Sequence, residues 1–197
     1  MIISETLLLE YGAVYKLYDK NEIIFSENSS PQFYFQIIKG SVELTHNTPN
    51  GREFTHDIVS DGQSIGEFFL LSDRRFSCSA ITITECEILM VCKSSFMHLL
   101  HKHPEINSSL LVNISKQMAD QYMMSSNLFN TDPSSKIENV ISHFKNEQNS
   151  PQFGFEVPFT RRQLANLTGL RVETVIRAVK KLESQHRLKI FNRRIYI

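Results

Sequence analysis

Hydrophobic and polar side chains alternate in short runs between Ala13 and about Val91. Turn-forming residues separate these runs at intervals of roughly 8 to 12 residues, which is typical of an all-β sandwich or barrel. Because successive side chains of a strand point to opposite faces, each run predicts a strand with one buried face. The predicted strands cover residues 14–18, 22–25, 32–38, 41–46, 53–59, 77–84 and 87–91.

Glycine-containing turns separate several of these predicted strands. They are Gly40, the run Pro49-Asn50-Gly51, the pair Asp61-Gly62, and Gly66. A glycine adopts a positive φ angle at little cost, so each of them suits a tight turn. The pattern therefore predicts a closed or double-sheet β domain.

The hydrophobic period changes after residue 91, where helices are expected. Ser94 or Ser95 can cap a short helix that runs through His101. Pro104 suits the first turn of a longer helix, which we expect to end near Asn127.

Apolar positions on the long helix recur at alternating spacings of three and four. These positions, with two polar interruptions, are Leu111, Ile114, Met118, Gln121, Ser125 and Leu128. This is the spacing of a coiled-coil seam. The helix could pack on its own β domain, or two chains could share the seam. We favour the shared seam of a homodimer, because the remaining modules point the same way.

A run of turn formers, Asn130-Thr131-Asp132-Pro133-Ser134-Ser135, predicts a hinge between domains after the long helix. A further helix should follow, with a polar loop after it that extends through Pro151. One apolar stripe of that helix is formed by Ile137, Val140, Ile141 and Phe144.

The segment from about residue 155 to 197 carries the pattern of a winged helix-turn-helix. Thr160-Arg161-Arg162-Gln163 is a capping box, in which the Thr and Gln side chains satisfy backbone groups at a helix start. Ala165 lies where two crossing helices approach, and Gly169 lies in the turn before a second helix over residues 172–183. The expected shared core comprises Leu164, Leu167, Leu170, Val175, Ala178, Val179 and Leu182.

A generic helical hairpin could use the same small residues for packing alone. The outer side of the second helix argues against it, because that side is polar or cationic: Arg171, Glu173, Thr174, Arg177, Lys180 and Lys181. Such side chains can reach base edges and phosphates in a major groove. Residues 188–197 predict two short strands around Asn192-Arg193, a wing from which Arg193 and Arg194 can contact the DNA backbone.

The charge distribution supports a division into two modules. Residues 1–150 hold 11 Lys and Arg against 18 Asp and Glu, a net of −7, whereas residues 151–197 hold 10 against 3, a net of +7. A basic segment on an acidic body suggests that the second module faces a polyanion. A charged face is also often merely solvated, so charge alone is weak evidence.

The length and composition are those of a globular protein. A chain of 197 residues with 41% hydrophobic content can bury one generous core or two modest ones. No apolar run approaches the roughly 20 residues of a membrane span, and no basic start followed by an apolar stretch marks export. We therefore expect a cytoplasmic protein with no membrane association.

The cysteines do not suggest a disulfide framework or a structural zinc site. Cys78, Cys86 and Cys92 are odd in number and form no CxxC pair. We expect three reduced, mostly buried thiols. A redox sensor would need an exposed thiol of low pKa.

With β domain, long helix, hinge and winged helix-turn-helix in this order, the chain resembles the cyclic-AMP receptor and fumarate-nitrate regulator (CRP/FNR) family along nearly its whole length. The matching residues are Lys39-Gly40-Ser41-Val42, Gly66-Glu67, Gln117-Met118-Ala119, Thr160-Arg161-Arg162-Gln163, and Glu173-Thr174-Val175 with Arg177. The resemblance implies an α+β fold: a double-stranded β-helix (jelly-roll) sensor domain over residues 1–103, a dimerisation helix over 104–129 and a winged helix-turn-helix domain over 130–197.

The resemblance also implies a homodimer that binds a two-fold symmetric operator on double-stranded DNA and acts through RNA polymerase. The expected DNA-contacting residues are Thr160, Arg161, Arg171, Val172, Glu173, Thr174, Arg177 and Arg193. Glu173 and Arg177 match base-contacting positions of the family, and Thr160 and Arg161 match phosphate-holding ones. Val172 stands where the family commonly has an Arg, so we expect an operator that differs from the familiar consensus.

The sensor pocket departs further from the family. Cyclic-nucleotide binders pair a Gly-Glu, whose carboxylate holds the ribose, with an Arg-Ser-Ala run whose Arg neutralises the phosphate; here that run reads Phe76-Ser77-Cys78. Arg75 lies one residue upstream, but strand alternation would place it on the opposite face. The expected pocket comprises Gly66, Glu67, Phe68, Arg75, Phe76, Ser77, Ser125 and Ser126. The two serines match the Thr-Ser position with which the family contacts the base.

Burying a phosphate without a paired cation is costly, so we disfavour cyclic AMP and expect a less charged effector or none. A cyclic-nucleotide-responsive regulator that uses a shifted Arg75 is one alternative. Another keeps the fold but acts by docking on a partner protein. No cofactor is expected.

An enzyme is the remaining alternative, with the β domain as a metal-dependent cupin. That chemistry needs a His-x-His, a Glu and a further His on barrel strands, whereas the barrel region has only His46 and His56. His98, His101 and His103 have no carboxylate clustered beside them, so we expect ordinary surface histidines and no metal site.

Overall fold

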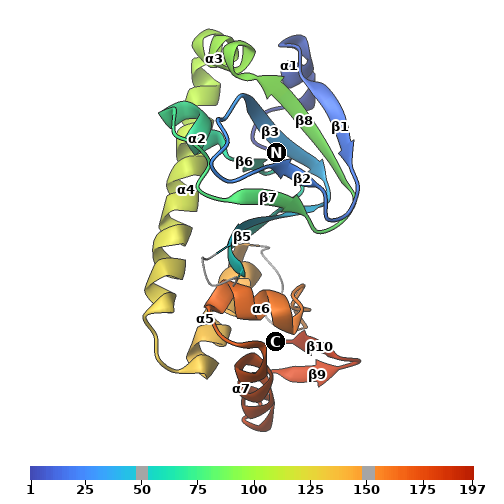
Figure 1. Ribbon diagram of the computed structural model, residues 1–197, viewed down its shortest axis with the longest axis vertical. Helices are drawn as coiled ribbons and strands as arrows, with labels where there is room; N and C mark the ends of the chain where they lie inside the picture. Colours follow the sequence, from blue (N-terminus) through green and yellow to red (C-terminus); the bar gives the residue numbers. More distant parts are fainter. Residues whose placement is uncertain (48–52, 148–153) are drawn as a thin grey trace. The chain divides into compact units, whose positions relative to one another are not determined.

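The computed structural model describes residues 1–47, 53–147 and 154–197 (Figure 1). The predicted turn Pro49-Asn50-Gly51 and the end of the predicted loop at Pro151 lie outside the described residues. The chain forms two compact units, Met1–Met118 and Ala119–Ile197. The boundary between them falls within the long helix α4 (Pro104–Leu128).

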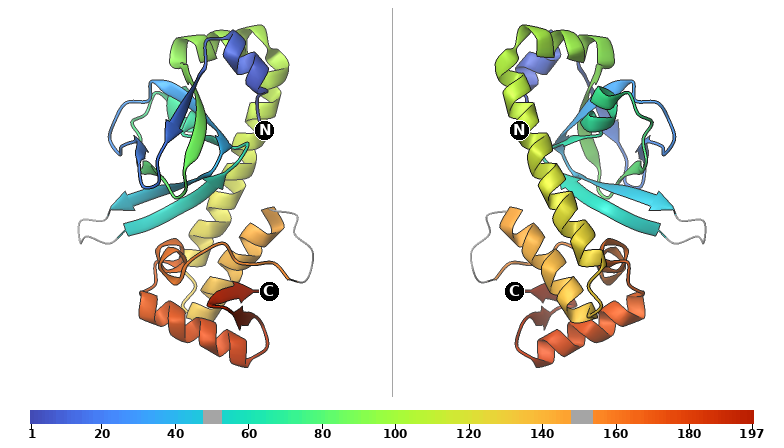
Figure 2. Two further views of the ribbon diagram at one scale, coloured as in Figure 1. Left: turned by 90° about the vertical axis from the view of Figure 1, so that its right-hand side faces the viewer. Right: turned by 90° about the vertical axis from the view of Figure 1, so that its left-hand side faces the viewer.

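Two antiparallel four-stranded sheets form the body of the first unit (Figure 2). The strands of one sheet, in spatial order, are β1 (Val14–Tyr18), β8 (Cys86–Cys92), β3 (Phe33–Lys39) and β6 (Ser64–Ile65). Those of the other are β2 (Ile23–Phe25), β7 (Ser79–Thr82), β4 (Ser41–Asn47) and β5 (Glu53–Ser60). Buried side chains from both sheets share one core, including Phe35, Ile37 and Ile88 from the first and Phe25 and Val42 from the second. This is the predicted double-sheet β domain, with alternate side chains turned into the space between the sheets.

Three short elements were missed by the pattern of hydrophobic positions. They are β6 and the helices α1 (Glu5–Glu10) and α2 (Glu67–Ser72). None exceeds six residues, so none completes enough turns or alternations to give a periodic signal. Backbone geometry sets the limits of α2, because Gly66 before it (φ +76°) and Asp73 after it (φ +55°) both adopt the left-handed conformation.

The predicted strand over residues 77–84 is shorter in the structure, where β7 covers Ser79–Thr82. The backbone just before β7 forms hydrogen bonds with the loop at residues 28–29, and not with a neighbouring strand. Phe76 N donates to Ser29 O at 3.1 Å, and Asn28 N donates to Phe76 O at 2.8 Å. These bonds fix Phe76 just upstream of the strand.

A second hydrophobic cluster lies beneath the helices of this unit. It joins α1 and α3 (Lys93–Lys102) to β3 and β8 through Leu8, Tyr34, Leu89 and Phe96, with Tyr34 and Phe96 stacked at 4.3 Å between ring centroids. The predicted N-cap of α3, Ser94 or Ser95, is wrong, since the cap position is Cys92. Both serine hydroxyls lie 3.3 Å from Cys92 Sγ.

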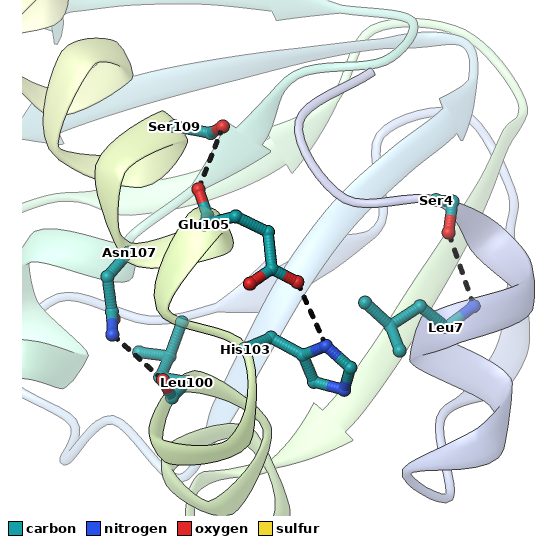
Figure 3. A network of polar contacts seen from close by, with 7 residues as sticks. All are labelled: Ser4, Leu7, Leu100, His103, Glu105, Asn107 and Ser109. Carbon is teal, nitrogen blue, oxygen red and sulfur yellow. Dashed lines mark hydrogen bonds and ion pairs between the residues drawn. The ribbon is translucent and has the colours of Figure 1, made fainter.

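Side chains hold the turn between α3 and α4 (Figure 3). Asn107 Nδ2 donates to Leu100 O at 2.8 Å, Ser109 Oγ donates to Glu105 O at 3.2 Å, and His103 Nδ1 lies 3.0 Å from Glu105 Oε1. Figure 3 also shows the start of α1, where Leu7 N donates to Ser4 Oγ at 3.4 Å. Pro104 is the first residue of α4, as predicted.

The barrel-facing side of α4 includes one position that was expected on the coiled-coil seam. Leu110 is buried and Ile114 is half-buried, and both pack on the second hydrophobic cluster. Leu111 and Met118 are exposed by 67% and 64%, and Gln121 is exposed as well. Ile114 therefore faces its own barrel.

The second unit contains α5 (Pro133–Glu147), α6 (Arg161–Thr168), α7 (Val172–Ser184) and the hairpin of β9 (Lys189–Phe191) and β10 (Arg194–Tyr196). The predicted hinge over residues 130–135 is too long, because Pro133, Ser134 and Ser135 belong to α5. Asp132 Oδ2 accepts from the Ser135 backbone N at 2.9 Å, and Pro133 needs no donor partner in a first turn.

A compact apolar core holds the second unit together. The predicted stripe of α5 is buried as expected, and Phe144 meets Phe159 edge-on at 4.5 Å between ring centroids. Val157 N donates to Ile195 O at 2.8 Å, which ties the strand-like segment before α6 to β10. Among the described residues, no helix is long and apolar enough to cross a membrane.

Candidate functional site

The start of α6 is fixed by the predicted capping box. Gln163 N donates to Thr160 Oγ1 at 3.2 Å, and Thr160 N donates to Gln163 Oε1 at 2.9 Å. Two backbone donors that would otherwise lack partners are thus satisfied reciprocally. The box fixes the first residue of α6 at Arg161.

Gly169 ends α6 and allows the chain to turn into α7. Its φ angle is +68°, a left-handed conformation that glycine adopts without strain, and Leu170 N then donates to Ala165 O at 3.1 Å. Ala165 is buried at the crossing, as are Val175 and Val179 of α7. The two helices therefore pack as a helix-turn-helix, with the small residue and the glycine where the sequence placed them (Figure 1).

The outward side of α7 carries the side chains predicted to contact DNA. Arg171, Glu173 and Arg177 are exposed, while Val172 and Thr174 are half-buried. Arg171 occupies the N-cap position without making a side-chain cap bond. Exposed lysines, Lys180 and Lys181, extend the same side toward the end of the helix.

Ile176 also lies on the exposed part of α7 and was missed by sequence reasoning. It is 42% exposed and precedes Arg177. The signal was present, because positions 173, 176, 177 and 180 share one helical face at spacings of three and four. An apolar side chain on such a face can contact the methyl group of thymine.

The wing is braced against α6 by one of the predicted phosphate contacts. Arg161 Nη1 donates to Arg193 O at 2.6 Å, and burial lowers the pKa of the Arg161 guanidinium. Asn192 and Arg193 form the turn with φ angles of +46° and +66°. The Arg193 side chain is exposed at this turn.

Arg194 was expected to be available for DNA backbone contact, and the structure gives it another partner. Its guanidinium pairs with the Glu156 carboxylate, which also accepts from Tyr196 Oη at 2.9 Å. The hydrogen bond from Arg194, then that from Tyr196, holds the pKa of Glu156 below its usual value. Arg194 thus joins the wing to the segment before α6.

In the sensor domain, Phe76 occupies the interior of the barrel. It is buried and stacks on Phe25 with 3.8 Å between ring centroids, and it meets Phe69 edge-on at 5.5 Å. A Cβ at Gly66 would lie 2.8 Å from the Phe76 ring. Only glycine can therefore pass this close to the aromatic group.

Of the other residues expected to form the sensor pocket, some are buried and others are exposed. Arg75 is exposed, and its Nη1 donates to Asn28 O at 2.7 Å. Ser77 is exposed as well, so both neighbours of the buried Phe76 face outward. This agrees with the expectation that Arg75 points away from the pocket. Phe68 is exposed too, whereas Gly66 and Glu67 are buried. Ser125 and Ser126 are exposed on α4, where Ser126 Oγ donates to Tyr122 O at 3.0 Å.

One oxygen of the buried Glu67 carboxyl is bonded to the long helix. Its Oε1 accepts from Gln117 Nε2 at 3.1 Å and from Asn113 Nδ2 at 3.4 Å, both on α4. Burial, the largest influence, raises the pKa of Glu67. Gln117 belongs to one of the motifs that resemble the family, whereas nothing in the sequence distinguishes Asn113.

Within the part of the chain that the structure describes, no group of three or more His, Cys, Asp and Glu side chains could hold a metal ion. His46 Nδ1 lies 2.9 Å from Glu27 Oε2 on the barrel, and His103 pairs with Glu105. These histidines have single carboxylate partners.

The thiols differ in exposure. Cys78 and Cys86 are buried, as expected, but Cys92 is exposed at the start of α3. Hydrogen bonds with the Ser94 and Ser95 hydroxyls lower the pKa of Cys92 to about 7. Burial raises the pKa of Cys78 to about 11.

Two family models match most of the chain. Residues 15–103 match the cyclic nucleotide-binding domain, and residues 137–197 match the Crp-like helix-turn-helix domain. The cAMP-activated global transcriptional regulator CRP of Pasteurella multocida is 24% identical over 192 residues, which cover 96% of this chain and 91% of that protein. The protein of the same name from Salmonella typhimurium is 24% identical over 196 residues, with coverage of 96% and 91%.

Solved structures share the fold. The c-di-GMP responsive global regulator CLP of Xanthomonas campestris superposes with a TM-score of 0.80 at 21% identity, covering 97% of this chain and 98% of that one. FixK2 from Bradyrhizobium japonicum also gives a TM-score of 0.80, at 20% identity and with coverage of 93% and 91%.

We predict that Cys92 is the thiol modified first by iodoacetamide near neutral pH, because it is exposed and its thiolate is favoured. Peptide mapping by mass spectrometry after a short exposure should find the label at Cys92, with Cys78 and Cys86 labelled only after denaturation. Replacing both Ser94 and Ser95 with Ala should move the midpoint of the rate against pH upward. Equal labelling of all three thiols in the folded protein would contradict this prediction.

Proposed function

Because the chain belongs to the CRP/FNR family of DNA-binding transcription regulators, we propose that it binds a two-fold symmetric operator as a homodimer, with α7 in the major groove. Regulators of this family are not enzymes, so the metal-dependent cupin is set aside. The observation that carries the proposal is the outward side of α7, where Arg171, Glu173 and Arg177 are exposed above a packed helix-turn-helix.

The proposed contacts fall into two groups. Glu173 and Arg177 contact base edges, with Arg171 and Thr174 beside them at the start of the helix, and Val172 contributes apolar surface. Thr160, Arg161 and Arg193 lie at the start of α6 and at the wing, where phosphates would pass. Arg161 contributes chiefly by holding the wing, since its guanidinium already donates to the Arg193 carbonyl.

The proposed dimer surface is the exposed side of α4. Its exposed positions are Leu111, Ser115, Met118, Tyr122, Ser125 and Phe129, at alternating spacings of four and three. Tyr122 is 73% exposed and Phe129 is 86% exposed, which is unusual for such large apolar groups on one helix and the residue after it. A second copy of the same helix buries these side chains by the self-complementary packing of a two-fold axis. This seam replaces Ile114, Gln121 and Leu128 of the expected one with Ser115, Tyr122 and Phe129.

The effector proposed for this regulator is not cyclic AMP bound in the family's usual way. Phe76 fills the interior beneath Gly66, and Arg75, which could replace the missing cation, is exposed and bonded to Asn28 O. A phosphate in this space would be buried without a counter-charge. The regulator CLP of Xanthomonas campestris, which shares the fold, is c-di-GMP responsive, so this fold accommodates signals other than cyclic AMP. Action through RNA polymerase follows from the family membership.

The operator proposal predicts salt-dependent binding that depends on α7. Against an operator selected from a random duplex pool, Arg177→Ala should weaken binding about tenfold to hundredfold, equivalent to about 1–3 kcal/mol, and relax discrimination at one base pair. Fluorescence anisotropy at several salt concentrations measures both effects. Lys20→Ala, a change at an exposed barrel lysine, is the control and should leave affinity unchanged. Binding without salt dependence, or none to any duplex, would overturn the proposal.

The dimer proposal predicts that a charge on the seam separates the subunits. Met118→Glu should convert a dimer into a monomer in sedimentation equilibrium, because two carboxylates would be buried together at the axis. Lys116→Glu introduces the same side chain at another exposed position of α4 and should remain dimeric. A wild-type chain that is monomeric at all concentrations would refute the dimer.

The filled barrel predicts no stabilisation by cyclic AMP. A thermal-shift titration with cyclic AMP should leave the melting temperature unchanged, and a rise of several degrees would count against the proposal. Phe76→Ala should lower the free energy of unfolding by about 3–5 kcal/mol, because it leaves a cavity beside Phe25 and Phe69. The control Phe68→Ala, at a partly exposed ring, should cost far less in the same urea titration.

A further inference from the structure

Glu67 is a fully buried carboxyl that joins the sensor domain to the long helix. Its side chain starts from α2, is 0% exposed and reaches α4 through Oε1, which accepts from Gln117 Nε2 at 3.1 Å and Asn113 Nδ2 at 3.4 Å. Asn113 and Gln117 are four residues apart and therefore lie on the same side of α4. One carboxyl oxygen thus holds two successive turns of the helix.

The second carboxyl oxygen lies without a partner beside another unsatisfied group. Glu67 Oε2 and Ser64 Oγ are both buried and make no hydrogen bond within the described parts of the chain. Ser64, on β6, is nevertheless close enough to lower the pKa of Glu67, although burial raises that pKa more strongly. A proton on Oε2 could be donated to Ser64 Oγ, so that both groups would be satisfied.

No cation in the described surroundings of Glu67 offsets a negative charge there. The groups that act on the carboxyl are Ser64 from β6, the backbone N–H of Glu67 itself, and Gln117 and Asn113 from α4, all of them uncharged. A titratable neighbour is the buried Tyr34 of β3, whose pKa is raised above its usual value chiefly by burial, so that the phenol stays neutral. Lys116 lies between the two amides in sequence but is exposed. These donors favour the carboxylate, but burial outweighs them and raises the pKa of Glu67. An ionised Glu67 would be a buried charge without a counter-ion, so the site favours the neutral acid.

We propose that uncharged Glu67 is the positioning residue that fastens the barrel-bound part of α4 to α2, and that loss of its proton loosens this fastening. The residue that would hold a ribose in a cyclic-nucleotide binder here bonds to the protein's own long helix. The inference rests on the proposed function in one respect only, that α4 is the dimer helix. If it is, the protonation state of Glu67 influences the position of the helix that carries the dimer seam.

The first test is the pH dependence of stability in the full chain. The folded-state pKa of Glu67 is raised above its unfolded value of about 4.3. Its contribution is therefore greatest below that value and is lost as the pH rises toward the folded pKa. Across this interval the unfolding equilibrium constant should increase by up to about tenfold per pH unit. Glu67→Gln removes that titration, so urea unfolding at each pH should show a shallower decline.

Glu10→Gln, which alters an exposed carboxyl of α1, is the matched control and should retain the wild-type pH profile. The inference is overturned if Glu67→Gln and the wild type decline with pH in parallel. A purely structural role for the side chain would shift stability by the same amount at every pH and would produce that parallel result.

The second test follows the helix itself and does not depend on the variant folding. Hydrogen–deuterium exchange of wild-type residues 105–118, corrected for the intrinsic pH dependence of exchange, should lose protection as pH rises through the interval, while the core strand β3 keeps its protection. Gln117→Leu should reduce the same protection at low pH. Protection of α4 that does not vary with pH would refute the inference. Both tests use the protein without DNA, so a failure to bind any operator would leave their outcome intact.

Discussion

The contact between Phe76 and the backbone of Gly66 determines the interior of the sensor domain. Phe76 stacks on Phe25 and meets Phe69 edge-on, so three aromatic rings fill the space between the two sheets next to α2. A Cβ at Gly66 would lie 2.8 Å from the Phe76 ring, and the positive φ angle of Gly66 is needed to start α2. The ring therefore constrains both the backbone path and the volume that remains for a ligand.

The same constraint explains the direction taken by Glu67. The residue follows Gly66 as the first of α2, and with the interior occupied by aromatic rings one oxygen of its carboxyl accepts hydrogen bonds from amides of α4. In a cyclic-nucleotide binder the corresponding carboxylate is satisfied by contact with a ribose. Here the hydrogen bonds run within the protein, which changes a recognition group into an internal link between two elements.

Much of the fold could be predicted from the sequence, because the strong signals are local. The hydrophobic run that predicts a strand over residues 14–18 and the capping box at Thr160 depend only on residues near in sequence. The structure confirms the box and the bounds of the strand as β1, although only Tyr18 of that strand is buried. The helix-turn-helix was also predictable, since Ala165 and Gly169 each serve a close approach or a positive φ angle. Short elements such as α2 gave no signal, because six residues contain fewer than two helical turns.

Long-range partners could not be predicted in the same way. Ile114 satisfies the spacing of a coiled-coil seam, yet the neighbouring cluster of barrel side chains determines that it faces inward. Arg194 is cationic and lies in a wing, but Glu156, 38 residues earlier, takes its guanidinium. Asn113 shows nothing in the sequence to distinguish it from a solvated residue, and its role depends on a carboxyl 46 residues away. The spacing of residues predicts which side chains share a face of a helix or strand. Whether that face is buried, and which group it pairs with, depends on partners that are distant in the sequence.

These internal pairings also limit what the net charge of the basic segment can indicate. Arg194 pairs with Glu156, Arg187 lies 2.9 Å from Glu138, and Arg161 donates to a backbone carbonyl of the wing. Three of the ten cations between residues 151 and 197 therefore hold the domain together. Four of the other seven cations lie on α7 or at its N-cap, and all four are exposed: Arg171, Arg177, Lys180 and Lys181. A positive charge that is concentrated on one rigid element can select a position and orientation on DNA, which the same charge spread over a surface could not do.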